Sequence, residues 1–408
     1  MSTAVYLTGL GVAAPNGLGA RRYWDATLSG RSGITEITRF DPARYPARLA
    51  GQILDFDARE HLPGRLRLQT DVSTRLALAA ADWALADAGV TGAEAFAAGL
   101  SDYDMSVVTA NALGGFDFTH RELRNLWSDG PRAVSVYESF AWFYAVNTGQ
   151  ISIRNGMRGP NCALVAEQAG GLDAIGQARR TIRRGAKLVL AGGVDSALDP
   201  WGWVAQLSCG RISRDPDPRR AYRPFDRTAC GYLPGEGGAL LVLEAAVRRG
   251  ARVYGEIAGY AATFDPPPGS ARPPALRRAI ELALADAGLE PRDVSVVFAD
   301  AAGVPVLDRA EAAAISAVFG PRSVPVTAPK ALTGRLYAGG GPLDVAAAAL
   351  SIRDGVIPAT CATSSVPDEY GIDLVTGRPR AGQPVITALV LARGKCGFNA
   401  AIILRAVR

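Results

Sequence analysis

Short apolar runs alternate along the chain with longer alanine-rich segments. The runs have the length and the β-branched content of buried strands, whereas the alanine-rich segments are long enough for helices. Strands are expected at 5–11, 187–191, 238–244, 255–260, 356–359 and 400–407, and helices at 75–88, 170–184, 276–287 and 343–353. This alternation predicts an α/β fold in which helices cover the faces of the sheets.

Two parts of the chain share a weak repeat. The tetrapeptide Ile182-Arg-Arg-Gly185 precedes one expected strand, and Ile352-Arg-Asp-Gly355 precedes another. Repeated patterns of this kind indicate a duplicated unit. We therefore expect two α/β halves, residues 1–248 and 249–408, joined near the charged stretch 245–254.

Composition narrows the class of protein. With 408 residues, of which 48% are hydrophobic and 20% charged, the chain can bury a large core. No apolar run is long enough to cross a bilayer, and the N-terminus lacks the basic and apolar regions of a signal peptide. The cytoplasm is the expected location.

The five cysteines are scattered and form no CxxC pair. No histidine lies at a spacing that would complete a metal site, so no metal is expected. In a reducing compartment such cysteines are usually small buried side chains. They are Cys162, Cys209, Cys230, Cys361 and Cys396.

The net charge of +5 is carried almost entirely by arginine. A local cluster suits an acidic or phosphorylated partner, although a solvated arginine-rich loop explains it equally well. Nucleic acid is disfavoured because no binding module is recognisable. The residues considered for docking are Arg211, Arg214, Arg219, Arg220 and Arg223.

Four segments follow one another in a characteristic order. Residues 159–171, GPNCALVAEQAGG, place Gln168 nine residues after a Gly-Pro pair. Next come YRPFD with GEGG, at 222–226 and 235–238, and then DAAGVPVLDRAE at 300–311. The last is KALTGR at 330–335.

In this order the segments resemble the β-ketoacyl synthases over nearly the whole chain. Condensing members carry a cysteine at the position of Gln168, where a strand turns into a helix whose N-terminus lowers the thiol pKa. They carry histidines at the positions of Asp300 and Arg335. The resemblance implies that all three catalytic positions are lost.

The supporting residues of the site are kept. Asp308, Glu311 and Lys330 match the family pattern, whereas Lys395 stands where the family usually places a gating phenylalanine. The fold implied is thiolase-like, two duplicated halves in an α-β-α-β-α arrangement. Because the two lost histidines converge on one carbonyl, we expect Asp300 and Arg335 to lie within ion-pair range, ~4 Å.

With glutamine within VAEQAGG, the chain resembles the chain length factors. These are the ketosynthase β subunits of bacterial type II polyketide synthases. The resemblance implies a non-condensing subunit that pairs with a ketosynthase α subunit and sets the length of an aromatic polyketide. Substrates would arrive on the phosphopantetheine arm of an acyl carrier protein, so no cofactor of its own is expected. Membrane and nucleic-acid partners are not implied.

The same resemblance identifies a stretch that closes the polyketide tunnel. Phe116, Thr119 and Leu123 lie on one face if their segment is helical, and Phe140 belongs to an aromatic stretch, 140–144. On spacing alone a buried core is the preferred explanation of these residues, and only the resemblance assigns them to a tunnel or, for 140–144, to a tunnel or subunit interface. Relatives that make shorter chains carry phenylalanine at the position of Leu123, which implies a deeper tunnel here.

Two other functions remain open. Gln168 has the shape and polarity of an acylated cysteine, so the site could decarboxylate malonyl carrier protein to start a chain. Alternatively, the subunit could be a scaffold whose tunnel walls do not matter. A self-sufficient condensing enzyme is least supported, because Cys162 lies upstream of the helix start.

Overall fold

A 12-stranded sheet forms the framework of the computed structural model, which describes residues 3–92, 95, 99–248, 250–267 and 269–407. Its order is β12-β11-β10-β13-β14-β9-β1-β8-β7-β5-β6, with β2 paired to β1. The strands of the first half are β1 (Tyr6–Ala14), β2 (Gly17–Leu18), β5 (Met105–Ala110), β6 (Cys162–Leu164), β7 (Leu188–Asp195) and β8 (Gly237–Glu244). Those of the second half are β9 (Gly255–Phe264), β10 (Val296–Phe298), β11 (Pro325–Thr327), β12 (Asp373–Leu374), β13 (Thr387–Arg393) and β14 (Phe398–Arg405).

The strand order reads as two matching units that meet at β1 and β9. From the centre outward, β1-β8-β7-β5-β6 corresponds to β9-β14-β13-β10-β11. The units are joined where Tyr6 pairs with Glu256 and Leu7 with Gly255. Residue 249, at the expected boundary between the halves, lies outside the described residues.

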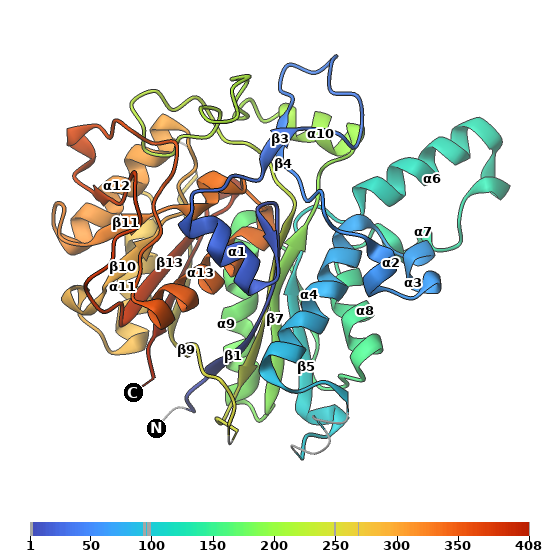
Figure 1. Ribbon diagram of the computed structural model, residues 1–408, viewed down its shortest axis with the longest axis horizontal. Coiled ribbons are helices and arrows are strands. Elements are labelled where there is room, and N and C mark those ends of the chain that lie inside the picture. Colours follow the sequence, from blue (N-terminus) through green and yellow to red (C-terminus); the bar gives the residue numbers. More distant parts are fainter. Residues whose placement is uncertain (1–2, 93–94, 96–98, 249, 268, 408) are drawn as a thin grey trace.

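Helices form three layers around the two units (Figure 1). The middle layer consists of α9 (Gly170–Arg183) and α13 (Gly340–Asp354), which pack against each other and against strands of both units. Outside lie α4 (Val72–Ala88) on one unit, and α11 (Leu276–Ala287) and α12 (Pro305–Phe319) on the other. The expected α-β-α-β-α arrangement is confirmed.

Glycines let the outer helices approach the strands closely. A Cβ on Gly11 of β1 would lie 1.8 Å from the carbonyl oxygen of Ala80 in α4. A Cβ on Gly259 of β9 would lie 2.2 Å from the carbonyl oxygen of Ala283 in α11. Both contacts exclude any side chain, so the duplicated units share one way of seating a helix on the sheet.

The sequence pattern predicted most of these elements, but two expectations were wrong. Residues 356–359 form no strand; Ile357 makes only an isolated bridge to Arg380, and Pro358 lacks the N–H that a ladder needs. The cysteines are not fully buried either. Cys230 and Cys396 are exposed, and the other three are half-buried.

One part of the first half stands away from the layers. In Figure 1, α6 (Phe116–Asp129) projects from the body beside α7 (Glu138–Ala141) and α8 (Val146–Asn155). Near its start lies α10 (Pro200–Leu207), which packs against α6. The remaining elements are α1 (Ala20–Leu28), α2 (Ala58–His61), α3 (Gly64–Gln69) and the hairpin β3 (Ile34–Glu36) with β4 (Leu49–Gly51). Among the described residues, no helix is long and apolar enough to cross a membrane.

Candidate functional site

Gln168 lies at a sharp turn between β6 and α9. The preceding residue, Glu167, has a φ of 50°, in the left-handed region that non-glycine residues rarely adopt. Its carboxylate holds the turn by accepting hydrogen bonds from the backbone N–H groups of Gln168, at 2.9 Å, and of Lys395, at 2.8 Å. Gln168 itself is only 1% exposed, and its amide nitrogen points toward Gly340 at the start of α13. The described residues offer that nitrogen no hydrogen-bond partner.

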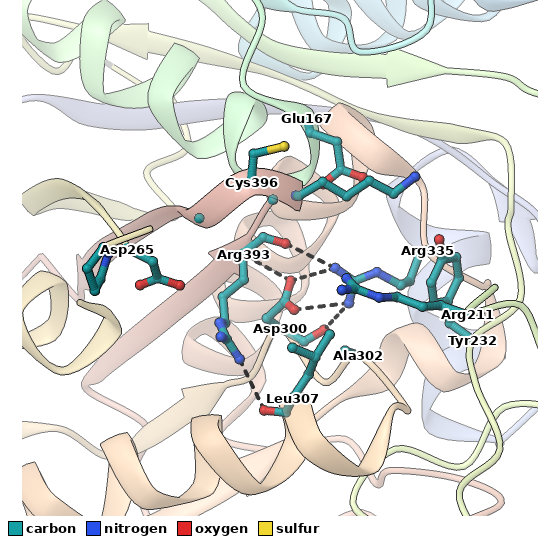
Figure 2. A pocket seen from close by; sticks show the side chains of 14 residues that line it. Glu167, Arg211, Tyr232, Asp265, Asp300, Ala302, Leu307, Arg335, Arg393 and Cys396 are labelled. Carbon is teal, nitrogen blue, oxygen red and sulfur yellow. Dashed lines mark hydrogen bonds and ion pairs between the residues drawn. The ribbon is translucent and has the colours of Figure 1, made fainter. Parts of the chain in front are cut away.

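Asp300 and Arg335 face each other in the same region (Figure 2). Nη1 of Arg335 donates to Oδ2 of Asp300, and Nη2 donates to Oδ1, each at 3.0 Å. Nη1 also reaches the backbone oxygen of Asp300, and Nη2 reaches that of Arg393 at 3.2 Å. The Asp300 side chain is 1% exposed and that of Arg335 8%. The expectation that the two residues meet is confirmed, as a bidentate buried ion pair.

The kept acidic residues hold the loop that carries Asp300. Glu311 accepts hydrogen bonds from the backbone N–H groups of Asp300, at 2.6 Å, and Ala301, at 2.8 Å. Asp308 accepts from the N–H groups of Phe225 and Gly303, at 2.8 and 2.9 Å. Both carboxylates therefore have a structural role that does not depend on catalysis.

Lys330 connects two elements of the second half through its ammonium group. Its ammonium lies 2.6 Å from Asp344 of α13, and it donates to the backbone oxygens of Ala299, at 2.7 Å, and Asp300, at 3.1 Å. Lys330 is 4% exposed. It ties α13 to the loop of Asp300 through its ion pair with Asp344.

Burial and charge act against each other in this cluster. Burial alone would raise the pKa of the Asp300 carboxyl, but the positive charges of Arg335 and Lys330 hold that pKa below its usual range. Burial raises the pKa of Glu311 to about 7, and the charge of Asp300 adds to this effect. Despite its burial, Arg335 has a pKa well above the usual value, because Asp300 stabilises its charged form.

A cavity of about 400 Å³ opens beside the ion pair. Its wall includes Arg211, Asp300, Arg335 and Lys395, whereas Gln168 does not line it. Both nitrogens at the end of the Arg335 guanidinium are already hydrogen-bonded. Within the described part of the chain, no group of three or more histidine, cysteine or acidic side chains could hold a metal ion.

The expected tunnel residues lie on α6, but they do not all share one surface. Leu123, 37% exposed, lines an open groove of about 530 Å³ between α6 and α10, together with Trp127 and Trp201. Phe116 packs edge-on against Trp201 at the start of the helix. Thr119 is half-buried on the same helix and does not line the groove.

The aromatic stretch expected to be either core or lining is largely at the surface. Phe140 is half-buried in α7, where its ring contacts Tyr137 with centroids 6.0 Å apart, outside the groove. Trp142, Phe143 and Tyr144 are exposed. A buried core helix at 140–144 is therefore ruled out.

The arginine cluster divides into two groups. Arg219 pairs with Asp217 at 3.1 Å, and both Arg220 and Arg223 approach Asp215 at 3.8 Å. Arg211 and Arg214 are exposed, and neither has an acidic partner among the described residues. Of the two, Arg211 also lines the cavity beside the ion pair.

The sequence pattern did not indicate the role of three buried carboxylates that join separate elements. Asp195 accepts hydrogen bonds from the backbone N–H groups of Ala112, Leu113 and Ala338, and so joins the approach to α6 with the segment before α13. Asp71 and Asp199 each cap a helix and contact α6. The Asp199-Pro200 pair is a helix-start signal, but its contact with α6 has no trace in the sequence.

Known proteins match the chain over its whole length. The family model for the β-ketoacyl synthase N-terminal domain matches residues 2–248, and the model for the C-terminal domain matches residues 254–364. A protein of Streptomyces coelicolor, named as an actinorhodin polyketide β-ketoacyl synthase 2, is 68% identical over 98% of both chains. The tetracenomycin polyketide synthase ketoacyl synthase beta subunit of Streptomyces glaucescens is 57% identical, again over 98% of both.

A solved structure shows the same fold. The ishigamide ketosynthase/chain length factor superposes with a TM-score of 0.89 at 28% identity, over 100% of each chain. Two family models, two long relatives and one full-length superposition therefore agree. The chain belongs to the β-ketoacyl synthase family, among the polyketide ketosynthase β subunits.

Proposed function

We propose that the chain is the non-condensing chain length factor of a type II polyketide synthase. It pairs in the cytoplasm with a ketosynthase α subunit to form the minimal synthase, and it sets the length of an aromatic polyketide. The observation that carries this proposal is the ion pair of Asp300 and Arg335. The pair occupies the two positions that a condensing enzyme needs for histidines.

Condensation requires a nucleophile and donors that are free to act on a carbonyl. The amide of Gln168 is not a nucleophile at neutral pH, and its side chain is buried. The donors of Arg335 are taken up by Asp300 and by the backbone oxygen of Arg393. The chain therefore lacks a nucleophile at Gln168, and the terminal nitrogens of Arg335 are not free to act on a carbonyl.

A protein partner fits the surface around β6. Among the described strands β6 pairs only with β5, so its other side is an open edge. Val165, directly after β6, is 54% exposed, and Trp142 and Phe143 are 47% and 48% exposed. An open sheet edge and exposed aromatic side chains are both features of surfaces suited to a large subunit interface. We assign this surface to the ketosynthase α subunit.

The groove between α6 and α10 is suited to a growing chain. It is open on one side, and a partner subunit covering it would turn it into a tunnel. Leu123 and Trp201 offer it apolar walls. Packed walls resist an additional ketide unit at a cost of about 1–3 kcal/mol, which would slow further elongation.

An acyl carrier protein delivers the substrates in this proposal. Its phosphopantetheine arm carries the acyl chain, so the subunit needs no cofactor of its own. Within the arginine cluster, Arg211 and Arg214 are exposed and have no acidic partners among the described residues. They are therefore favoured over Arg219, Arg220 and Arg223 for docking the acidic carrier.

The two other functions are less well supported. Decarboxylation of malonyl carrier protein needs a free donor near the developing enolate, and both terminal nitrogens of Arg335 are occupied. A scaffold alone would not require an open groove lined by Leu123. Replacing Leu123 separates the scaffold from a chain length factor, since only the latter changes its product.

Co-expression tests the proposal. The chain, a cysteine-bearing ketosynthase and a carrier protein are combined, each is omitted in turn, and the polyketides are sized by mass spectrometry. We expect polyketides of one dominant length only when all three are present, and no condensation by the chain with carrier protein alone. Condensation without the ketosynthase, or an unchanged product without the chain, would refute the proposal.

A further inference from the structure

The projecting helix α6 is fastened to the body by buried carboxylates from two other elements. The first is Asp71, which is 1% exposed. Its Oδ1 accepts the backbone N–H of Ser73, at 2.8 Å, and caps α4. Its Oδ2 accepts the backbone N–H of Phe118, at 3.0 Å, in the first turn of α6. One side chain thus holds the starts of two helices.

The second carboxylate is Asp199, which joins α6 to α10. Its Oδ1 accepts the N–H groups of Trp201, at 2.8 Å, and Gly202, at 3.3 Å, and caps α10. Its Oδ2 lies 2.7 Å from Nδ1 of His120 on α6. A carboxylate can only accept, so Nδ1 carries the proton of this bond. The Asp199 side chain is 6% exposed and that of His120 26%.

The spacing of α6 and α10 is tight at this point. A Cβ on Gly202 would lie 3.3 Å from Cγ of Phe116. The ring of Phe116 also packs on Trp201, which belongs to α10. The hydrogen bond of His120 and Asp199 therefore acts close to this contact between the two helices, and His120 itself lines the groove.

The walls of the groove extend beyond this anchor. Leu123 and Trp127 lie three and seven residues further along α6, which is about 5 and 10 Å of helix rise. A small tilt of α6 about its anchor would displace both side chains from α10. Groove width consequently depends on the anchor as well as on the side chains that line it.

We propose that the hydrogen bond between His120 and Asp199 fixes α6 against α10 and thereby keeps the polyketide at one length. His120 and Asp199 are positioning residues, acting through Leu123 and Trp127. The inference rests on the proposed function, because it assigns the groove to the growing chain.

Variants at His120 separate the hydrogen bond from the bulk of the side chain. His120→Asn keeps an N–H donor close to the place of Nδ1, whereas His120→Leu has the same branching without a donor. Leucine is also the better helix former, so lost helix propensity cannot explain a defect of the leucine variant. His61→Leu is the matched control, since the ring of His61 stacks on Phe56 and does not line the groove.

Each variant is co-expressed with the ketosynthase and carrier protein, and the polyketides are sized beside wild type and Leu123→Phe. For His120→Leu, we expect the ratio of the main product to other lengths to fall about fivefold, the equivalent of one lost hydrogen bond. His120→Asn and His61→Leu should keep the wild-type distribution. Where His120→Leu gives no heterodimer, Asp199→Ser replaces it, because serine still caps α10 but is too short to reach His120.

The outcomes separate this inference from the proposed function. A wild-type distribution for both His120→Leu and Asp199→Ser would overturn the positioning role, as would a His120→Asn product like that of His120→Leu. A shorter product for Leu123→Phe in the same experiment would leave the proposed function intact. No effect of Leu123→Phe would instead refute the assignment of the groove to the growing chain, the part of the proposed function on which this inference rests.

Discussion

The ring of Phe116 meets the indole of Trp201 edge to face, with ring centroids 5.1 Å apart and planes inclined at 82°. Trp201 lines the groove between α6 and α10, and Leu123 lines the groove from α6. Aromatic pairs in this arrangement contribute about 0.5–1.5 kcal/mol beyond their buried area. The depth available to a chain is therefore bounded by named side chains.

Enlarging Leu123 should shorten the polyketide. Leu123→Phe and Leu123→Trp add volume to the groove wall, and the overpacking of a further ketide unit costs about 1–3 kcal/mol. Phe116→Ala should lengthen the product or leave it unchanged. The mass distribution of polyketides from the reconstituted synthase measures both effects. Identical distributions for wild type and Leu123→Trp, at normal protein yield, would show that Leu123 does not limit length.

Removing Arg335 should destabilise the fold strongly. Arg335→Ala leaves the Asp300 carboxylate buried and unpaired, which typically costs about 3–5 kcal/mol. Replacing both residues with alanine should cost less than the sum of the two single changes, because no lone charge remains. Urea denaturation gives the free energies of unfolding.

The exposed pair of Arg322 and Asp368 supplies a control for that series. Its charged atoms approach to 2.6 Å, closer than the 3.0 Å of the buried pair, but the side chains are 60% and 91% exposed. Arg322→Ala should cost less than about 1 kcal/mol. If Arg335→Ala costs no more than this control, the ion pair does not stabilise the fold.

Stability should fall as the pH rises from about 4 toward 8. Burial raises the pKa of Asp195 to about 8, so the folded state holds a proton that the unfolded state releases near pH 4. A raised carboxyl pKa stabilises the fold below the unfolded value, and this stabilisation is lost as the pH rises through the folded value. Asp308 and Asp344, with pKa values raised to about 6 by burial, act in the same direction.

One variant isolates the contribution of Asp195. An asparagine side chain cannot titrate, so Asp195→Asn should flatten the dependence by up to about 1.4 kcal/mol per pH unit between pH 5 and 8. Chemical denaturation at several pH values supplies the slopes. Equal slopes for variant and wild type would show that the Asp195 carboxyl does not bind the extra proton of the folded state.

Charge at the open sheet edge should block assembly. Phe143→Glu and Val165→Glu each place a carboxylate on the surface assigned to the ketosynthase, where desolvation would be costly. Co-purification with a tagged ketosynthase should fall at least about tenfold for either variant. Val306→Glu is the control, because Val306 is 69% exposed on α12, on the far side of the molecule from α7 (Figure 1). Equal co-purification of all variants would place the interface elsewhere.

Carrier protein binding should distinguish two arginines of one loop. Arg211→Glu reverses a charge that has no acidic partner among the described residues and should weaken binding about fivefold or more at low salt. Arg219 is already paired with Asp217, so Arg219→Glu should have a smaller effect. Titration with carrier protein at two salt concentrations gives the comparison. A larger effect of Arg219→Glu than of Arg211→Glu would show that the carrier protein docks at Arg219 instead of Arg211.

The sequence predicted the fold where elements are long and strongly patterned. The alanine-rich pattern predicts a helix at 276–287, the bounds that α11 has in the structure. The predicted helix 75–88 corresponds to α4, which starts three residues earlier because Asp71 caps it. Strands β10 and β11 have three residues each, too few for a periodic signal to emerge. The expected strand 356–359 does not form, because Pro358 has no backbone N–H to donate to a neighbouring strand.

The candidate site was predictable to the extent that it rests on motif order. Asp300 and Arg335 lie 35 residues apart in the chain, yet their contact followed from the two positions they occupy in the family pattern. The bonds of Asp199 to His120 and of Asp71 to Phe118 depend on how α6 docks, which no local pattern encodes. The sequence likewise does not reveal that residues 142–144 lie at the surface, because a run of aromatic residues is equally typical of a buried core.

The ion pair of Asp300 and Arg335 also constrains the evolution of the chain. A single reversion to histidine at either position would strand the other charge in a buried site, at a cost of several kcal/mol, about 3–5. Natural proteins have total stabilities of only about 5–15 kcal/mol, so such an intermediate would often fail to fold. On the proposed function, a lineage that returned to catalysis would have to replace both residues together, and Gln168 as well. The pair would then act as an epistatic ratchet that keeps the subunit dependent on its catalytic partner.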